Sequence, residues 1–194
     1  APQYFDDLIA FACIGARTTE SQPHRELASG LSVPVGFKNS TSGSVTAAIN
    51  AIHSATEPKS FMGITQNGKA AVIHTTGNQN CCLVLRGGTT PNYERAIVQK
   101  YVEQLDSEGI NRAIIVDASH GNSGKDWQQQ MQVIDYLSKA RHPSIRGLMI
   151  ESFIRDGSQS VLKKPLEYGI SVTDSCIGFD KTATLMIQLN NTIR

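Results

Sequence analysis

The chain has 194 residues, with 18 basic and 17 acidic side chains, a formal charge of +1 and a hydrophobic fraction of 40%. This balance excludes the broad positive surface of nucleic-acid-binding proteins, and no apolar run approaches the roughly 20 residues of a membrane span. The length suits one domain or part of a larger one. The four cysteines, at positions 13, 81, 82 and 176, lack CxxC spacing, so we expect buried free thiols in a cytoplasmic protein.

Short apolar runs alternate along the chain with longer segments of helical period. Most runs lack a polar face, as expected for strands of a parallel sheet that is covered on both sides. The order predicts an α/β fold with right-handed crossovers. Asn67-Gly68 is a two-residue turn signal and predicts a hairpin at about 61–76, inserted between core units. We expect strands at 11–16, 33–37, 61–64, 82–85, 113–116 and 147–150, and helices at 19–29, 44–55, 92–108, 125–140 and 182–192.

Ionisable side chains follow the predicted core strands at their carboxyl ends. In parallel α/β folds these ends meet on one face, where sites are built, so we expect the side chains to gather there. Three are cations, which suit a dianionic substrate, and a His, a Glu and an Asp together suit a divalent metal such as Mn²⁺, Fe²⁺ or Zn²⁺. In chain order they are Arg17, Lys38, Arg86, His120, Glu151 and Asp174, the last after a brief β-prone run at 171–173. Asp117 also follows the predicted strand that precedes His120.

Each of these residues also has a structural interpretation. Arg17 would be an exposed residue at a helix start, and Lys38 would extend into water from a strand end. His120 would be a hydrogen-bonded surface histidine, and Asp174 would cap a turn. Residues 121–126 (GNSGKD) lack Walker A spacing, and no GxSxG or GxGxxG motif is present. ATP hydrolysis, serine hydrolysis and dinucleotide binding are therefore disfavoured.

Several long motifs resemble the type I 3-deoxy-D-arabino-heptulosonate 7-phosphate (DAHP) synthases, in the same order from end to end. The resemblance implies a (β/α)₈ TIM barrel and a transferase at the entry of the shikimate pathway, which leads to chorismate and the aromatic amino acids. The implied reaction condenses phosphoenolpyruvate with erythrose 4-phosphate and water, giving DAHP and phosphate. The matching stretches are GARTTESQ at 15–22, HRELASG at 24–30, PVGFKN at 34–39, LRGG at 85–88, PNY at 91–93, SHGNS at 119–123, MIES at 149–152, and YG at 168–169 with TD at 173–174.

The resemblance also assigns roles to the residues at the strand ends. The three cations correspond to the phosphoenolpyruvate-binding residues, and the His, Glu and Asp correspond to three of four ligands of a catalytic divalent metal, with Mn²⁺, Fe²⁺, Co²⁺ and Zn²⁺ left open. Two of the residues carry the implied catalytic roles. The substrate-binding set is Arg17, Lys38 and Arg86, the metal set is His120, Glu151 and Asp174, and the catalytic set is Lys38 and His120.

The resemblance covers the carboxyl-terminal portion of the family's barrel. We expect residues 1–194 to be the carboxyl-terminal part of a single TIM-barrel domain, with about five core strands and helices and the inserted hairpin. The family's first three strands fall outside the resemblance, and with them a cysteine metal ligand and a Lys-Pro-Arg-Thr segment. For the chain alone we therefore expect an unclosed barrel, exposed apolar strand edges and no useful activity.

The family is commonly inhibited by an aromatic amino acid that binds near the inserted hairpin. The small Gly63 favours tyrosine over phenylalanine as the implied effector. The alternative is that the hairpin only forms an oligomer contact, since the resemblance also implies a homo-oligomer. The matching stretches contain Pro2, Gln3, Ser32, Phe61, Gly63 and Ile73.

Two functions of different classes follow. The first is a metal-dependent, carbon–carbon-bond-forming transferase, with the chain as part of it. The second is an inactive piece that binds phosphate compounds or pairs with a missing amino-terminal segment. A sister enzyme that makes another keto sugar acid phosphate is a lesser alternative, which the hairpin and the GARTTE stretch at 15–20 disfavour. None of these functions involves nucleic acid or a membrane.

Overall fold

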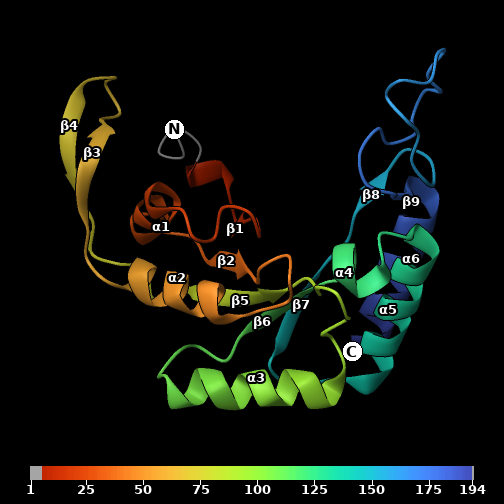
Figure 1. Cartoon of the computed structure of the whole chain (residues 1–194), viewed down its shortest axis with the longest axis horizontal. Helices are drawn as coiled ribbons and strands as arrows, with labels where there is room; N and C mark the ends of the chain where they lie inside the picture. The colour runs from red at the N-terminus through yellow and green to blue at the C-terminus, as the bar shows by residue number, and fades with distance from the viewer. Residues whose placement is uncertain (1–5, 194) are drawn as a thin grey trace.

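A five-stranded parallel sheet lies at the centre of the computed structural model of the chain, which describes residues 6–193 (Figure 1). Each strand pairs in parallel with its neighbour, so every connection is a crossover. This arrangement confirms the predicted α/β fold. In spatial order the strands are β1 (Ala12–Ile14), β2 (Val35–Lys38), β5 (Cys81–Leu85), β6 (Ile114–Asp117) and β7 (Ile145–Met149).

Helices form the crossovers, and their apolar faces pack on the sheet. In α3, Val98, Val102 and Leu105 are buried at the spacing of one helix face. Asp126 caps α5, where its side chain accepts hydrogen bonds from two backbone N–H groups of the first turn. The helices are α1 (Gln22–Ser29), α2 (Thr46–Thr56), α3 (Arg95–Ser107), the single turn α4 (His120–Ser123), α5 (Trp127–Ala140) and α6 (Phe179–Ile193), and a 3₁₀ turn spans Asp6–Leu8.

The core lies between the helices and the middle of the sheet. Every residue of β5 is buried, and Leu83 and Leu85 pack with residues of α2, α3 and α5. The outer strands are less covered. Ala12 and Ile14 of β1 pack against the core, so Cys13 points to the opposite face and is exposed. All four cysteines are free as expected, but the prediction of a buried thiol is wrong for Cys13.

The hairpin is a separate two-stranded sheet formed by β3 (Ser60–Ile64) and β4 (Ala70–His74), and it projects to one side of the molecule (Figure 1). This confirms the predicted insertion. Gly68 has a φ of +76°, which glycine adopts without strain and which the tight turn requires. Alternate residues are exposed along both strands, and Met62 and Val72 lie on the exposed face.

Several sequence-based boundaries differ from the structure by a few residues. The first helix begins at Gln22 rather than at residue 19, because the Thr19 hydroxyl donates to the carbonyls of Gly15 and Lys38 instead of capping a helix. The β-prone run at 171–173 forms only an isolated β-bridge, between Ser171 and Ser158, rather than a strand. The Ser171 hydroxyl accepts from the Thr173 backbone N–H, and such local bonds compete with strand pairing.

The last strands are short. β8 (Ser152–Phe153) follows β7 after two residues and pairs in parallel with β9 (Ile177–Gly178). Within the described residues the main sheet ends at β1 and β7, so the structure shows an open α/β sheet rather than a closed barrel. No helix in residues 6–193 is long and apolar enough to span a membrane.

The packing predicts a contrast between two isoleucines in helices. Ile134 in α5 is 0% exposed, whereas Ile187 in α6 is 65% exposed. We expect Ile134→Ala to lower the free energy of unfolding by about 2–5 kcal/mol because it leaves a cavity. Ile187→Ala is expected to change it by less than about 0.5 kcal/mol. Urea unfolding measures both, and equal losses would contradict the assigned core.

Candidate active site

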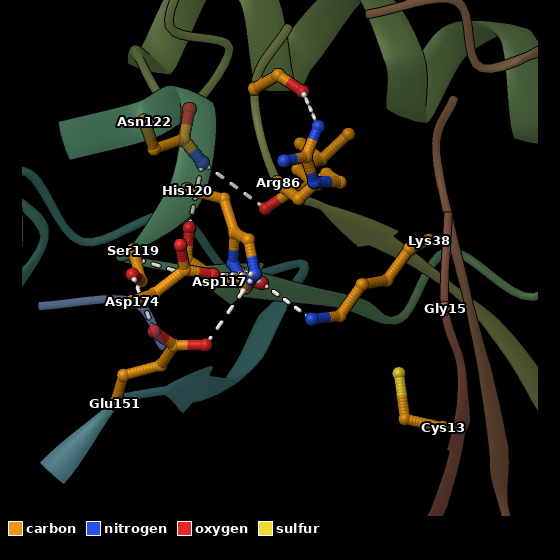
Figure 2. A network of polar contacts seen from close by, with 12 residues as sticks. Cys13, Gly15, Lys38, Arg86, Asp117, Ser119, His120, Asn122, Glu151 and Asp174 are labelled. Atoms are coloured by element: carbon orange, nitrogen blue, oxygen red, sulfur yellow. Dashed lines mark hydrogen bonds and ion pairs between the residues drawn. The ribbon is translucent and has the colours of Figure 1, made fainter. Parts of the chain in front are cut away.

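Side chains from four neighbouring strands meet at the carboxyl end of the sheet (Figure 2). Lys38 and Asp117 are the last residues of β2 and β6, and Arg86 directly follows β5. His120 opens α4 with a φ of +50°, a conformation that non-glycine residues rarely adopt and that is concentrated at functional sites. Glu151 lies two residues after the last residue of β7. The strand ends therefore gather one histidine, two cations and two carboxylates.

His120, Glu151 and Asp174 form a cluster with the geometry of a metal site. His120 Nε2 lies 3.4 Å from Glu151 Oε1 and 3.7 Å from Asp174 Oδ2, and one donor atom of each residue lies within 4.8 Å of the others. Ligands about 2.0–2.2 Å from one ion are separated by similar distances. One imidazole and two carboxylates suit Mn²⁺, Fe²⁺ or Zn²⁺, so the residues fit a divalent metal.

Each carboxylate of the cluster has one oxygen facing His120 and the other held by a neighbour. Ser119 Oγ donates to Glu151 Oε2 over 3.2 Å, and Lys125 Nζ lies 3.2 Å from Asp174 Oδ1. These contacts leave one oxygen of each carboxylate for a shared ligand. The arrangement favours one bond from each carboxylate to a metal.

Asp117 links His120 to Lys38. Lys38 Nζ donates to Asp117 Oδ2 over 2.7 Å, and His120 Nδ1 lies 2.9 Å from the same oxygen. Burial of Asp117 favours a higher pKa, but the close approach of the His120 ring and the charge and hydrogen bond of Lys38 outweigh it, so the pKa lies below its usual value. Asp117 is therefore the ionised partner of both residues.

The three predicted substrate cations are placed differently. Lys38 is largely buried beside Asp117, and Arg86 is 8% exposed, with Nη1 donating to the Gly87 carbonyl over 3.4 Å. Arg17 is exposed on the loop after β1, and within the described part of the chain no hydrogen bond or ion pair joins it to the other site residues. The structure thus brings Lys38 close to His120, whereas Arg17 lies at the edge of the site.

Three buried asparagines connect the strand ends, and sequence reasoning missed them. Asn39 Oδ1 accepts from the Arg86 backbone N–H over 2.8 Å, and Asn39 Nδ2 donates to the Gly87 carbonyl. Asn92 Oδ1 accepts from the Gly87 N–H, and the Asn92 N–H donates to Asn122 Oδ1. Asn122 Nδ2 donates to the carbonyl oxygens of two strand ends, Leu85 and Asp117.

Glycines let the loops of the site touch backbone to backbone. A Cβ on Gly121 would lie 2.6 Å from the Gly88 nitrogen, and one on Gly88 would lie 2.4 Å from the Gly43 nitrogen. Gly87 has a φ of +70° and is equally crowded against residues 121 and 122. Only glycine fits these contacts, so the loops after β2, β5 and β6 are held together at the site.

Comparison with known proteins identifies the family. A profile described as the DAHP synthetase I family matches residues 1–186. The chain belongs to this family. It is 46% identical to the Tyr-sensitive phospho-2-dehydro-3-deoxyheptonate aldolase of Escherichia coli K12, over 98% of the chain and 55% of that relative. Identity to the Phe-sensitive enzyme of the same strain is 45%, over 100% of the chain and 56% of that relative.

A solved structure of the family has the same fold. The phospho-2-dehydro-3-deoxyheptonate aldolase of Francisella tularensis SCHU S4 is 45% identical, with a TM-score of 0.91 over 98% of this chain and 57% of that chain. The resemblance drawn from the sequence motifs is therefore confirmed. The chain spans about half the length of the curated relatives it matches.

The effector residues implied by the family lie around one cavity away from the metal cluster. A cavity of about 870 Å³ lies between α1 and the hairpin, and Ser32, Phe61, Gly63 and Ile73 line it. Gln3, like the neighbouring Pro2, lies outside the described residues. The structure thus gathers the described members of the set in one place, and their role as an effector site stays a prediction.

The asparagine network predicts a loss of stability on truncation. Asn122→Ala leaves the Asn92 N–H and the carbonyls of Leu85 and Asp117 without a partner in a buried region. We expect the free energy of unfolding to fall by about 1–3 kcal/mol or more. Asn111→Ala is the control, because the exposed Asn111 side chain accepts only from the nearby Ala113 N–H. Equal losses in urea unfolding would contradict the role of the network.

Proposed function

We propose that the chain forms part of a DAHP synthase, which condenses phosphoenolpyruvate with erythrose 4-phosphate and water to give DAHP and phosphate. This metal-dependent, aldol-type reaction is the first step of the shikimate pathway. The observation that carries the proposal is the cluster of His120, Glu151 and Asp174, joined through Asp117 to Lys38 at the strand ends. The family membership and the names of the relatives support the same reaction.

The cations are assigned to phosphoenolpyruvate. Lys38 and Arg86 project from adjacent strands and are largely buried, so their charges are weakly screened and bind phosphate and carboxylate oxygens strongly. Binding of both anionic groups orients the enol carbon toward the second substrate. Arg17, exposed on the loop after β1, is proposed as a third phosphate ligand that approaches from the edge of the site.

The histidine and the two carboxylates are assigned to a divalent metal. His120 Nε2, Glu151 Oε1 and Asp174 Oδ2 are the atoms that would hold it. When bound, the metal supplies a Lewis acid for the aldehyde oxygen of erythrose 4-phosphate. Lys38 carries ammonium protons at Nζ beside this cluster, so it is the proposed proton-handling group of the chain.

The open sheet is proposed to be the carboxyl-terminal part of a single TIM-barrel domain. Two residues separate β8 from β7, and β8 pairs in parallel with β9 in a separate two-stranded sheet, as short strands further round a barrel would. The Tyr-sensitive relative of Escherichia coli K12 is nearly twice as long, which leaves length for the strands that would close the barrel. By itself, the chain is proposed to be inactive and to bind phosphate compounds or an amino-terminal segment.

The cavity beside the hairpin is proposed to bind an aromatic amino acid effector. Its walls combine Phe61 and Ile73 with the backbone around Gly63, which suits an aromatic ring. The names of two matched relatives, Tyr-sensitive and Phe-sensitive, support an effector of this class. The full-length protein is further proposed to be a homo-oligomer.

A chimera tests the proposed reaction. In this chimera the chain replaces the matching part of the Escherichia coli Tyr-sensitive relative. We expect the chimera to form DAHP when Mn²⁺ is present, and the chain alone to form none. In the chimera, His120→Ala is expected to lower the rate at least about 100-fold. His24→Ala is the control, because His24 is exposed on α1 and contacts only Ser21. A folded chimera that binds Mn²⁺ without forming product would refute the proposal.

Thermal unfolding tests the effector cavity. Tyrosine at about 100 times its Kd stabilises a protein by about 2.7 kcal/mol, so we expect the Tm of the chain to rise by several degrees. Phe61→Ala is expected to remove the rise, because Phe61 lines the cavity. Val72→Ala on the exposed hairpin face is expected to keep it. No rise with tyrosine or phenylalanine would favour the oligomer-contact interpretation of the hairpin.

A further inference from the structure

We propose that Asp117 is a positioning residue, whose single buried carboxylate orients the ring of His120 and places the ammonium group of Lys38 at the same time. The inference deepens the proposed function and rests on it, because His120 and Lys38 take their roles from that proposal. Asp117 acts through these two neighbours rather than on the reacting atoms. One side chain thereby sets the spacing between the metal ligand and the substrate cation.

The carboxylate of Asp117 is held from several sides (Figure 2). Its side chain is 0% exposed, and Oδ1 accepts from the Ser119 backbone N–H over 2.9 Å. Oδ2 lies 2.7 Å from Lys38 Nζ and 2.9 Å from His120 Nδ1. The Asp117 carbonyl oxygen accepts from Asn122, which fixes the backbone as well. A carboxylate held in this way is a rigid reference point for both partners.

The two ring nitrogens of His120 face different groups. Nε2 faces Glu151 and Asp174, and Nδ1 faces Asp117. Nδ1 is buried without a well-aligned acceptor in the described residues, and Asp117 Oδ2 is the oxygen that a small ring rotation would align with it. A proton held at Nδ1 leaves the lone pair of Nε2 free for a metal. Asp117 therefore favours the tautomer that a metal ligand requires.

Lys38 shares the oxygen that orients the histidine. The Lys38 side chain is 13% exposed and therefore needs a compensating negative charge. A merely structural interpretation follows, in which Asp117 only neutralises Lys38. The two interpretations differ once Lys38 is removed, because charge balance no longer needs Asp117 but the orientation of His120 still does.

The test compares two variants that differ only at Asp117. Lys38→Met and the double variant Lys38→Met/Asp117→Asn both lack the buried ammonium group. A difference between them therefore does not come from a lysine charge left without its partner. The first readout is the tautomer of the neutral His120 ring, measured by ¹⁵N NMR on the 194-residue chain without metal. The second readout is the Kd for Mn²⁺. Glu108→Gln is the control, because Glu108 contacts another histidine, His53, at 3.1 Å.

Positioning by Asp117 predicts that Lys38→Met keeps the proton of the neutral ring on Nδ1 and that the double variant loses this preference. The double variant is also expected to bind Mn²⁺ about 10–100 times more weakly than Lys38→Met. Glu108→Gln is expected to leave the His120 tautomer and the Kd for Mn²⁺ the same as in the unchanged chain. The same tautomer in both Lys38→Met variants would overturn the inference.

Failure of the proposed function gives a different result. In one outcome the unchanged chain does not bind Mn²⁺, while the neutral His120 ring carries its proton on Nδ1 in Lys38→Met and loses this preference in the double variant. The metal assignment then fails and the positioning role stands. If Mn²⁺ binds equally to both Lys38→Met variants, the positioning role fails and the metal site stands.

Discussion

The buried polar groups at the ends of β2, β5 and β6 must all find partners, and the site depends on how they do so. Asn39, Asn92 and Asn122 satisfy the backbone groups that the sheet ladder leaves unpaired there. Because each asparagine bonds to a different strand end or loop, the three ends keep one relative position. The side chains that leave these ends, Lys38, Arg86 and Asp117, inherit that position.

Much of the fold and part of the site could be predicted from the sequence, because the relevant signals are local. Apolar runs indicated the parallel strands, and Asn67-Gly68 indicated the hairpin, since both depend on neighbouring residues. His120 and Glu151 could be selected because the carboxyl end of a strand is visible in the chain order. Their residue types already suited a divalent metal, and the family resemblance supported the same assignment.

Other features depend on contacts between residues far apart in the chain, and no pattern in one sequence reveals them. Asp117 follows a predicted strand, but its contact with Lys38, which is 79 residues away, emerges only when the chain folds. The Gly88–Gly121 contact likewise becomes visible only when the loops meet. Asp174 lies in a bend before β9, so the β-prone run that precedes it does not form the strand that places the other site residues, and the family motif alone identified it correctly as a neighbour of His120.

The hairpin has a consequence for how proteins of this family diverge. The sheet passes directly from β2 to β5, so β3 and β4 contribute no hydrogen bond to it. Substitutions, insertions or deletions in the hairpin therefore leave the register of the sheet unchanged. Duplicated genes can accumulate changes there under separate selection while the strand ends stay constant.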